Sequence, residues 1–443
     1  MVESSYISKR ISLVVLASVL LAPTLSKGGA ESALIPTHLG MADALRLFRE
    51  RGFDLMVADA MVESANGDAK IAGASPNLAF SGGVGRSFAF DSKQCPGCSA
   101  LAWSAGVSDQ SALSDSISGK RGLRSRTAEL ALAVARQARA DAQRVLESAL
   151  RQQYLQAVYA RDALDLARES QKRLSQVLEL NQARFDHGAI SQVDVLKVET
   201  EKLNADQDVE RAEFSLLDAK YSLAFLLGMR GHIPDFEVDA DLPRYHIPDD
   251  LGNATVDSLL DRARKQRPDL AAARLQHERA TSAVQSAKRL RVPDFSLSLG
   301  FSGQGGGSDV SSPPTVSLGL TLTPPLLYRY QGEIQKAQAD QRVQDTLLAK
   351  TEAQLVNDVS TALAQFQSTR RRVERAEHGL LDRAQRTRDL VQIQYEKGAA
   401  SLLEYLDAQR TFIDTQGAYL RDLADYWLAV TLIGQAIGLE LGP

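Results

Sequence analysis

The chain has 443 residues and a formal net charge of −4, and aromatic residues make up 6% of it. This weakly acidic balance gives no sign of a basic surface for nucleic acid. Few aromatic residues, together with long tracts of Ala, Leu, Gln, Arg and Glu, are typical of long helices rather than of a compact mixed core. The length allows two or three ordinary domains.

Residues 1–30 are predicted to be a signal peptide. Lys9 and Arg10 supply positive charge, an apolar run covers residues 11–25, and small residues follow near Ala30. An uncleaved anchor is the alternative, but the run is shorter than the about 20 apolar residues of a membrane helix. Beyond this leader no apolar tract of the sequence is long enough to cross a bilayer, so a membrane part would have to consist of β-strands.

The mature chain is predicted to consist of two copies of one unit. The segment Phe185–Leu196 matches Tyr395–Leu406, and the matching glycines Gly188 and Gly398 lie 210 residues apart. Such an internal repeat defines the organisation of the whole chain. The expected parts are a first repeat at 31–228, a connector at 229–255 and a second repeat at 256–443.

Each repeat is predicted to hold a helix of moderate length, a β-hairpin and a hairpin of two long helices. No Gly or Pro lies between Gly122 and Gly188, which predicts one helix of about 100 Å at 1.5 Å per residue. Gly379 interrupts the matching tract of the second copy and predicts a bend there. In the first copy the expected bounds are 41–70 for the first helix, 77–108 for the β-hairpin and 120–228 for the helical hairpin. In the second copy they are 256–290, 293–323 and 331–440 in the same order.

The β-hairpins carry the most diagnostic pattern. Residues 295–302 and 316–323 alternate strictly between apolar and small or polar residues, which predicts strands with two different faces. Their polar faces suit a water-filled lumen, and their lengths approach the about 9–11 residues of a tilted membrane strand. Soluble hairpins lying on a core are the alternative, because this alternation is a weak signal. The noisier candidate strand residues of the first copy are Leu78, Phe80, Val84, Phe88, Phe90, Leu101, Trp103 and Val107.

Four strands per chain cannot close a barrel that holds a pore. An open sheet edge is not tolerated in lipid, because every backbone group there must be paired. The smallest common membrane barrels have about eight strands. Several chains would therefore share one barrel: two copies would suffice, three would give a wider lumen, and the strand pattern does not choose between them.

Cys95 and Cys98 are the two cysteines and flank the turn dipeptide Pro96-Gly97. The ends of a β-turn lie within about 7 Å, which overlaps the Cα separation of a disulfide. Because an exported protein meets an oxidising compartment, we predict a local disulfide at the tip of the first β-hairpin. A redox centre would prefer a strand-to-helix setting, and a metal site usually needs about four ligands.

In its order of elements, twice over, the chain resembles the TolC-type outer membrane efflux proteins, the outer membrane factors of tripartite export systems. The resemblance covers nearly the whole mature chain, and the duplicated turn at Gly188 and Gly398 is its most specific part. It implies a mainly α fold with a transmembrane β-barrel part. Three chains would form a twelve-stranded β-barrel and a long periplasmic α-helical barrel in the outer membrane of a Gram-negative bacterium.

The resemblance also implies a function and partners. The chain would be the passive exit duct of a tripartite efflux or type I secretion system. Its partners would be a periplasmic adaptor (membrane fusion) protein and, through it, an inner-membrane pump of the RND, ABC or MFS class. We expect no enzymatic activity and no cofactor, because the six histidines are scattered and show no ligand or triad spacing. The alternative is a soluble periplasmic coiled-coil adaptor or scaffold protein.

The duplicated turn has a structural interpretation of its own. Gly188 and Gly398 stand where a helix should end, since glycine readily takes the left-handed conformation found there. Ser191 and Ser401 suit the N-cap of the next helix, and an acid three residues later predicts a capping box in both copies. The resemblance adds that these four residues mark the helical tips where the adaptor docks.

The resemblance further implies that the channel is constricted at these tips. The family's acidic constriction residues correspond to Glu404 and Asp407, which lie one helical turn apart. In three copies they would form rings of negative charge, which favour cations. The family's closed state also uses a tyrosine and an acid that correspond to Tyr395 and Asp194.

The sequence has Ala400 at a position where the family's best-studied pattern has an arginine. In that pattern the arginine holds the gate closed by a salt bridge. We therefore expect the resting gate to be held less tightly than in that case, or to use Arg184 or Lys397 instead.

Overall fold

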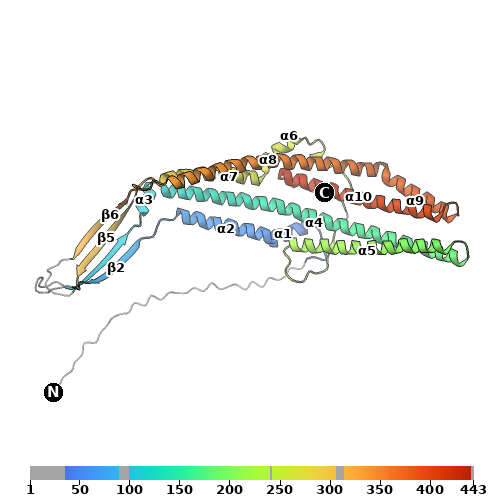
Figure 1. Ribbon diagram of the computed structural model, residues 1–443, viewed down its shortest axis with the longest axis horizontal. Helices are drawn as coiled ribbons and strands as arrows, with labels where there is room; N and C mark the ends of the chain where they lie inside the picture. Colours follow the sequence, from blue (N-terminus) through green and yellow to red (C-terminus); the bar gives the residue numbers. More distant parts are fainter. Residues whose placement is uncertain (1–34, 89–98, 240–241, 306–313, 441–443) are drawn as a thin grey trace, which may run out of the picture. The chain divides into compact units, whose positions relative to one another are not determined.

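Figure 1 shows the computed structural model of the chain. The chain separates into residues 1–35 and a compact unit from Pro36 onward, to which all the elements below belong. The predicted signal peptide, the predicted disulfide of Cys95 and Cys98, and Phe90 lie outside the described residues. The residues that the structure describes are 35–88, 99–239, 242–305 and 314–440.

The first helical hairpin begins with one uninterrupted helix, as its sequence predicts. The helix α4 comprises the 67 residues Lys120–Asp186, which corresponds to about 100 Å at 1.5 Å per residue. The helix α5, Gln192–Leu226, returns along α4 and packs against it (Figure 1). The absence of Gly and Pro from the interior of α4 removes the usual causes of a helix break.

The second helical hairpin is interrupted where Gly379 predicts a bend. Its helices are α8 at Gln331–Arg375, α9 at Leu381–Glu396 and α10 at Leu402–Ile437. Between α8 and α9, residues Ala376–Leu380 form a π-helical turn in which Gly379 has a φ of 154°. Side chains rarely tolerate this backbone conformation, so the bend depends on the glycine.

The helix of moderate length is broken in two in each repeat, so the prediction of single helices at 41–70 and 256–290 is wrong. Arg267 has a φ of −71° and a ψ of 118°, because the residue before a proline is driven out of the α region and Pro268 follows. Gly52 makes the matching break with a φ of −56° and a ψ of 120°. The resulting helices are α1 at Met41–Arg51, α2 at Phe53–Gly73, α6 at Val256–Gln266 and α7 at Pro268–Arg289.

The last turns of the long helices pack on these breaks. The residues that follow α5 and α10 include left-handed glycines, Gly228 with a φ of 72° and Gly438 with a φ of 77°. A Cβ atom at Gly228 would lie 2.2 Å from the carbonyl oxygen of Arg51, and one at Gly438 would lie 3.3 Å from the backbone of Gln266. Glycine is therefore needed at Gly228 for the close approach of two backbones as well as for its φ.

The connector between the repeats is fastened to α10. The indole Nε1 of Trp427 donates to the carbonyl oxygen of Pro243 at 2.8 Å, and the hydroxyl of Tyr426 donates to that of His246 at 2.7 Å. Both rings are fully buried, and their polar atoms are paired, as buried aromatic residues require. The remaining small elements are the parallel pair β1 (His38–Leu39) and β4 (Glu237–Val238), the helix α3 (Ala112–Ile117) and a 3-10 turn at Asp249–Leu251.

The two β-hairpins join into one antiparallel sheet in the order β2-β3-β5-β6 (Figure 1). The central strands β3 and β5 come from different repeats, so the sheet unites the two copies. The strands β2 and β6 are the edges of the sheet in the part of the chain that the structure describes. The bounds are Ala79–Arg86 for β2, Leu101–Ser108 for β3, Asp294–Gln304 for β5 and Thr315–Thr323 for β6.

The register gives this sheet one apolar face and one face of small residues. A row of four apolar residues crosses all the strands and consists of Phe80, Val107, Leu299 and Leu318. A neighbouring row on the other face consists of Ser81, Gly106, Gly300 and Ser317. Phe80 is 82% exposed and Leu318 is 78% exposed. Large apolar side chains exposed over a whole sheet face mark a surface that something outside the chain covers.

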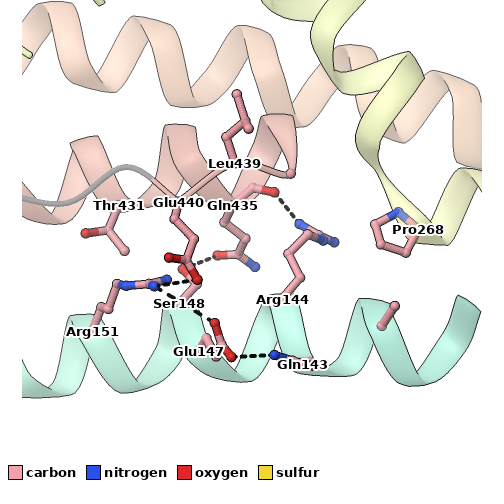
Figure 2. A pocket seen from close by; sticks show the side chains of 12 residues that line it. Gln143, Arg144, Glu147, Ser148, Arg151, Pro268, Thr431, Gln435, Leu439 and Glu440 are labelled. Atoms are coloured by element: carbon pink, nitrogen blue, oxygen red, sulfur yellow. Dashed lines mark hydrogen bonds and ion pairs between the residues drawn. The ribbon is translucent and has the colours of Figure 1, made fainter. Parts of the chain in front are cut away.

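An ion network around the buried Glu147 joins the residues that follow α10 to the middle of α4, beside a cavity of about 220 Å³ (Figure 2). The carboxylate of Glu147 is buried and accepts hydrogen bonds from Arg49 Nε and Gln143 Nε2, both at 2.7 Å. Arg151 pairs with Glu440 at 3.1 Å. Burial raises the pKa of the Glu147 carboxyl, but the hydrogen bonds from Arg49 and Gln143 outweigh it, so the pKa lies below its ordinary value.

Two arginines satisfy the last carbonyl groups of α10. Arg144 Nη1 donates to the carbonyl oxygen of Gln435 (Figure 2), and Arg267 Nη1 donates to that of Ala436 at 3.3 Å. Arg267 is itself held by two hydrogen bonds to Asp269, of 3.0 and 2.6 Å. The final carbonyls of a helix have no partner within it and carry partial negative charge. The two guanidinium groups therefore anchor the end of α10 on α4 and on the α6–α7 break.

We expect Glu147→Gln to lower the free energy of unfolding by about 1–2 kcal/mol near neutral pH, because the buried carboxylate loses its charged hydrogen bonds from Arg49, while the half-exposed Arg49 keeps Glu440 as a partner. Since the folded-state pKa is depressed, this stabilisation is present above the unfolded carboxyl pKa of about 4.3 and disappears as pH falls through the folded value. The loss of thermal stability, followed by circular dichroism at a fixed scan rate, should therefore be larger at pH 7 than at pH 4.

The control variant is Glu213→Gln, which breaks the exposed pair of Glu213 and Arg168. An exposed pair contributes about 0–1 kcal/mol, so this variant should unfold close to the wild-type temperature. A Glu147→Gln protein as stable as the wild type at pH 7 would contradict the role assigned to the network.

Candidate functional site

Two turns with the same backbone geometry join the long helices, and both lie at the same end of the molecule (Figure 1). Gly188 has a φ of 72° and Gly398 a φ of 76°. The amide of Gly188 donates to the carbonyl oxygen of Phe185 at 2.8 Å, and that of Gly398 donates to the carbonyl oxygen of Tyr395 at 3.1 Å. The amide of the residue after each glycine donates at 2.8 Å to the carbonyl oxygen five residues before it. This pair of bonds is the Schellman helix end, so the prediction of a left-handed glycine at each turn is confirmed.

The serines cap the following helices, as predicted, but only the second copy has a complete capping box. The Oγ of Ser401 accepts from the amide of Glu404 at 3.3 Å, and the Glu404 carboxylate accepts from the Ser401 amide at 2.7 Å. The Oγ of Ser191 accepts from the Asp194 amide at 3.3 Å, whereas the Asp194 carboxylate accepts from the Ser191 hydroxyl at 2.8 Å. This bond from the hydroxyl replaces the predicted hydrogen bond from the Ser191 amide to the Asp194 carboxylate, because aspartate is one methylene shorter than glutamate.

Glu404 and Asp407 lie exposed on the first turns of α10, three residues apart. The amide of Ser401, and then its hydroxyl, hold the pKa of the Glu404 carboxyl below its ordinary value. The Ser191 hydroxyl lowers the pKa of Asp194, and Lys197 acts in the same direction with its Nζ 3.6 Å from the carboxylate. Both of these carboxylates are therefore charged at neutral pH.

Tyr395 belongs to a small buried cluster behind the tip. Its hydroxyl donates to Oδ1 of Asn181 at 2.6 Å, and its ring stacks on that of Tyr405 with the centroids 5.1 Å apart. The guanidinium carbon of Arg184 lies 4.8 Å from the centre of the Tyr395 ring, within cation–π range. Aliphatic side chains of α4, α5, α9 and α10 complete the cluster. These contacts hold the ends of α4, α9 and α10 together.

The structure therefore does not join the two residues that the family pattern assigns to one gate. Tyr395 and Asp194 each have the other partners given above. Arg184, one of the two replacements expected for the arginine missing at Ala400, also donates to the carbonyl oxygen of Glu396 at 3.4 Å. Arg184 thus links the end of α4 to the end of α9.

Sequence reasoning missed Asn181 and Tyr405. Asn181 is fully buried and continues the apolar stripe of Leu174 and Val177 on α4 at helical spacing. A polar residue inside such a stripe needs a hydrogen-bond partner. The position of Asn181 in the stripe was therefore the sequence feature that could have identified it. Tyr405 follows Glu404 directly, and no local pattern distinguishes its buried ring from an exposed one.

The tips present charged side chains and helix ends that the buried cluster holds together. Among the residues that the structure describes, no three side chains of His, Cys, Asp or Glu gather as metal ligands. Within those same residues, none of the helices has both the length and the apolar character needed to cross a membrane.

Comparisons with known proteins agree with this architecture. Residues 44–229 and 259–439 match the family model described as outer membrane efflux protein. The cobalt-zinc-cadmium resistance protein CzcC of Cupriavidus metallidurans is 28% identical to this chain over 331 residues, which cover 73% of this chain and 74% of CzcC. The pyoverdine export outer membrane protein OpmQ of Pseudomonas aeruginosa is 27% identical over 63% of this chain and 58% of OpmQ.

The fold has counterparts among solved structures. The open state of the outer membrane channel MtrE of Neisseria gonorrhoeae matches with a TM-score of 0.73 and 18% identity, over 91% of this chain and 89% of MtrE. At this identity the likeness concerns the fold alone. The family model, by contrast, spans most of the sequence in two segments that each contain one β-hairpin and one helical hairpin. The chain therefore belongs to the outer membrane efflux protein family.

Proposed function

We propose that three copies of this chain form an exit duct in the outer membrane of a Gram-negative bacterium, with the long helices extending into the periplasm. The duct receives substrates from a periplasmic adaptor protein and an inner-membrane pump, and it passes them to the exterior without catalysing a reaction. The observation that carries this proposal is the exposed apolar face of the four-stranded sheet in a chain of the outer membrane efflux protein family.

The dimensions and chemistry of the sheet support this assignment. Its strands contain 8 to 11 residues, and a tilted membrane strand needs about 9–11. The apolar face suits hydrocarbon, and the face of Ser, Thr and Gly suits a water-filled lumen. Three copies would supply twelve strands, with β6 of one chain beside β2 of the next. A soluble adaptor or scaffold, the alternative function, would leave the apolar face in water.

The two turns fit the periplasmic tip of such a duct. Gly188, Ser191, Gly398 and Ser401 are all exposed, so they are available to the adaptor. Three copies of the exposed acids on α10 would form negative rings around the axis, which attract cations and repel anions. Because CzcC and OpmQ are named for different substrates, the proposal concerns the duct and leaves cargo selection to the adaptor and to a pump of the RND, ABC or MFS class.

The native mass of the mature protein tests the proposed assembly. We expect outer membranes extracted with a mild detergent to yield a particle with three times the mass of the mature chain, measured by light scattering with the detergent contribution subtracted. A monomer or dimer recovered from the periplasm without detergent would contradict the shared barrel and favour the scaffold.

Replacing Glu404 and Asp407 together by Ala should lower cation preference several-fold, because it removes the charge of both proposed rings. The measurement is the reversal potential across a planar bilayer in a salt gradient. Asp382→Ala is the control, since Asp382 lies on α9 and pairs with Arg386 on its own helix. An unchanged reversal potential in the double variant would exclude these acids as the selectivity filter.

Tyr395→Phe should increase the resting conductance. The change removes the bond to Asn181, whose buried carbonyl then lacks a donor, and a buried unpaired acceptor costs about 1–3 kcal/mol. Tyr419→Phe is a matched control, because it removes a tyrosine–glutamate bond of 2.8 Å outside the cluster. If single-channel recordings show the same conductance for Tyr395→Phe and the wild type, the cluster does not restrain the tip.

A further inference from the structure

A second cavity, of about 350 Å³, lies between α4, α9 and α10 beside the buried tyrosine cluster. Most of its lining consists of long polar side chains. Arg173 and Gln176 come from α4, Arg388 and Gln392 from α9, and Gln409 from α10. A cavity with such a lining is suited to a polar occupant.

Three nitrogen donors of this lining have no hydrogen-bond partner within the described protein. They are Nη1 of Arg173, Nε of Arg388 and Nε2 of Gln409. The side chain of Gln409 is strongly buried, with 4% of the residue exposed. Buried polar groups are nearly always paired. Since all three atoms are donors, a partner that satisfies them together must be an acceptor.

The charges at the cavity point to an anion. The guanidinium carbons of Arg173 and Arg388 lie 5.7 and 4.3 Å from the centre of the same Phe412 ring. The ion pair of Arg173 is made with Glu169 on its own helix, and that of Arg388 with the adjacent Asp389. Neither acid lines the cavity. Two positive groups brought together repel each other, and a negative charge between them relieves this repulsion.

The one acidic residue of the lining does not fill this role. Glu396 is exposed, and its carboxylate accepts a hydrogen bond from Nε2 of Gln392 at 3.0 Å. With Glu396 in this position, Nη1 of Arg173, Nε of Arg388 and Nε2 of Gln409 still have no partner.

We propose that this cavity binds a small oxoanion of the phosphate class. The planar donor fork of a guanidinium group matches the oxygen atoms of phosphate, and the amide of Gln409 supplies a further N–H. A bound oxoanion would link α4, α9 and α10 immediately behind the tip. The proposal does not depend on the proposed function, because it uses contacts within one chain.

Calorimetric titration of inorganic phosphate into the purified mature protein in detergent tests the site, with ionic strength held constant by sodium chloride. We expect saturable binding by the wild type. Gln409→Met and Arg388→Met keep much of the side-chain length but lose the donor, and should bind at least about tenfold more weakly, since a charge-assisted hydrogen bond is lost. Arg386→Met, an exposed arginine of α9, should bind as the wild type does.

Gln409→Glu provides a second test that does not depend on a weakened protein. It places a carboxylate beside both arginines, so the variant should lose phosphate binding and unfold at a higher temperature than the wild type in phosphate-free buffer. Absence of phosphate binding by the wild type would overturn the proposal. So would equal affinities of the wild type, Gln409→Met and Gln409→Glu, because the anion would then bind elsewhere.

Discussion

The two unpaired edges of the four-stranded sheet are the constraint on which the rest of the structure depends. Among the described residues, β2 and β6 each have a strand on one side alone, and the apolar face that they frame is exposed. In hydrocarbon, each unpaired backbone group costs several kcal/mol. One chain therefore cannot place this sheet in a membrane, and identical neighbours provide the simplest partners for its edges. In the proposed trimer, membrane insertion and assembly would therefore be a single physical event.

Duplication gives the chain two copies of one unit but also allows the two copies to differ. Tyr395 and Asn181 come from different repeats, and their hydrogen bond closes the cluster behind the tip. At the matching positions, 210 residues away, stand Phe185 and Val391, which cannot form the reciprocal bond. The backbone turns are the same in both copies. The hydrogen bond between Tyr395 and Asn181 is therefore one-sided, because the exchange of the two copies does not reproduce it.

Features that depend on local chemistry were predictable from the sequence. A tract without Gly or Pro gives the continuous α4, and a glycine followed by a serine three residues later gives each turn. The break at Arg267 was also accessible, because it precedes Pro268. The break at Gly52 was not predictable in this way, because it accompanies a tertiary contact, the packing of Gly228 against the backbone of Arg51.

The distinction between local and tertiary contacts also separates the predicted site residues from the missed ones. The caps at Ser191 and Ser401 are formed within three residues, so spacing reveals them. The partner of Tyr395 is 214 positions away in the sequence, and a single sequence without relatives holds no signal that pairs them. The resemblance also assigns Asp194 to the gate, and here that carboxylate accepts a hydrogen bond from the hydroxyl of Ser191, its own helix cap.

The electrostatics of the tip follow from the two faces of α10. Asp407 is exposed, whereas Gln409, two residues later, is buried, because two residues of an α-helix span more than half a turn. The acids therefore stand on one side of α10, and Arg173 and Arg388 lie at the cavity on the other. Positive charge behind the helix weakens the negative potential in front of it. An oxoanion in the cavity would offset the arginines and strengthen the potential of the acids, so the two proposed sites are coupled through the field although they rest on separate observations.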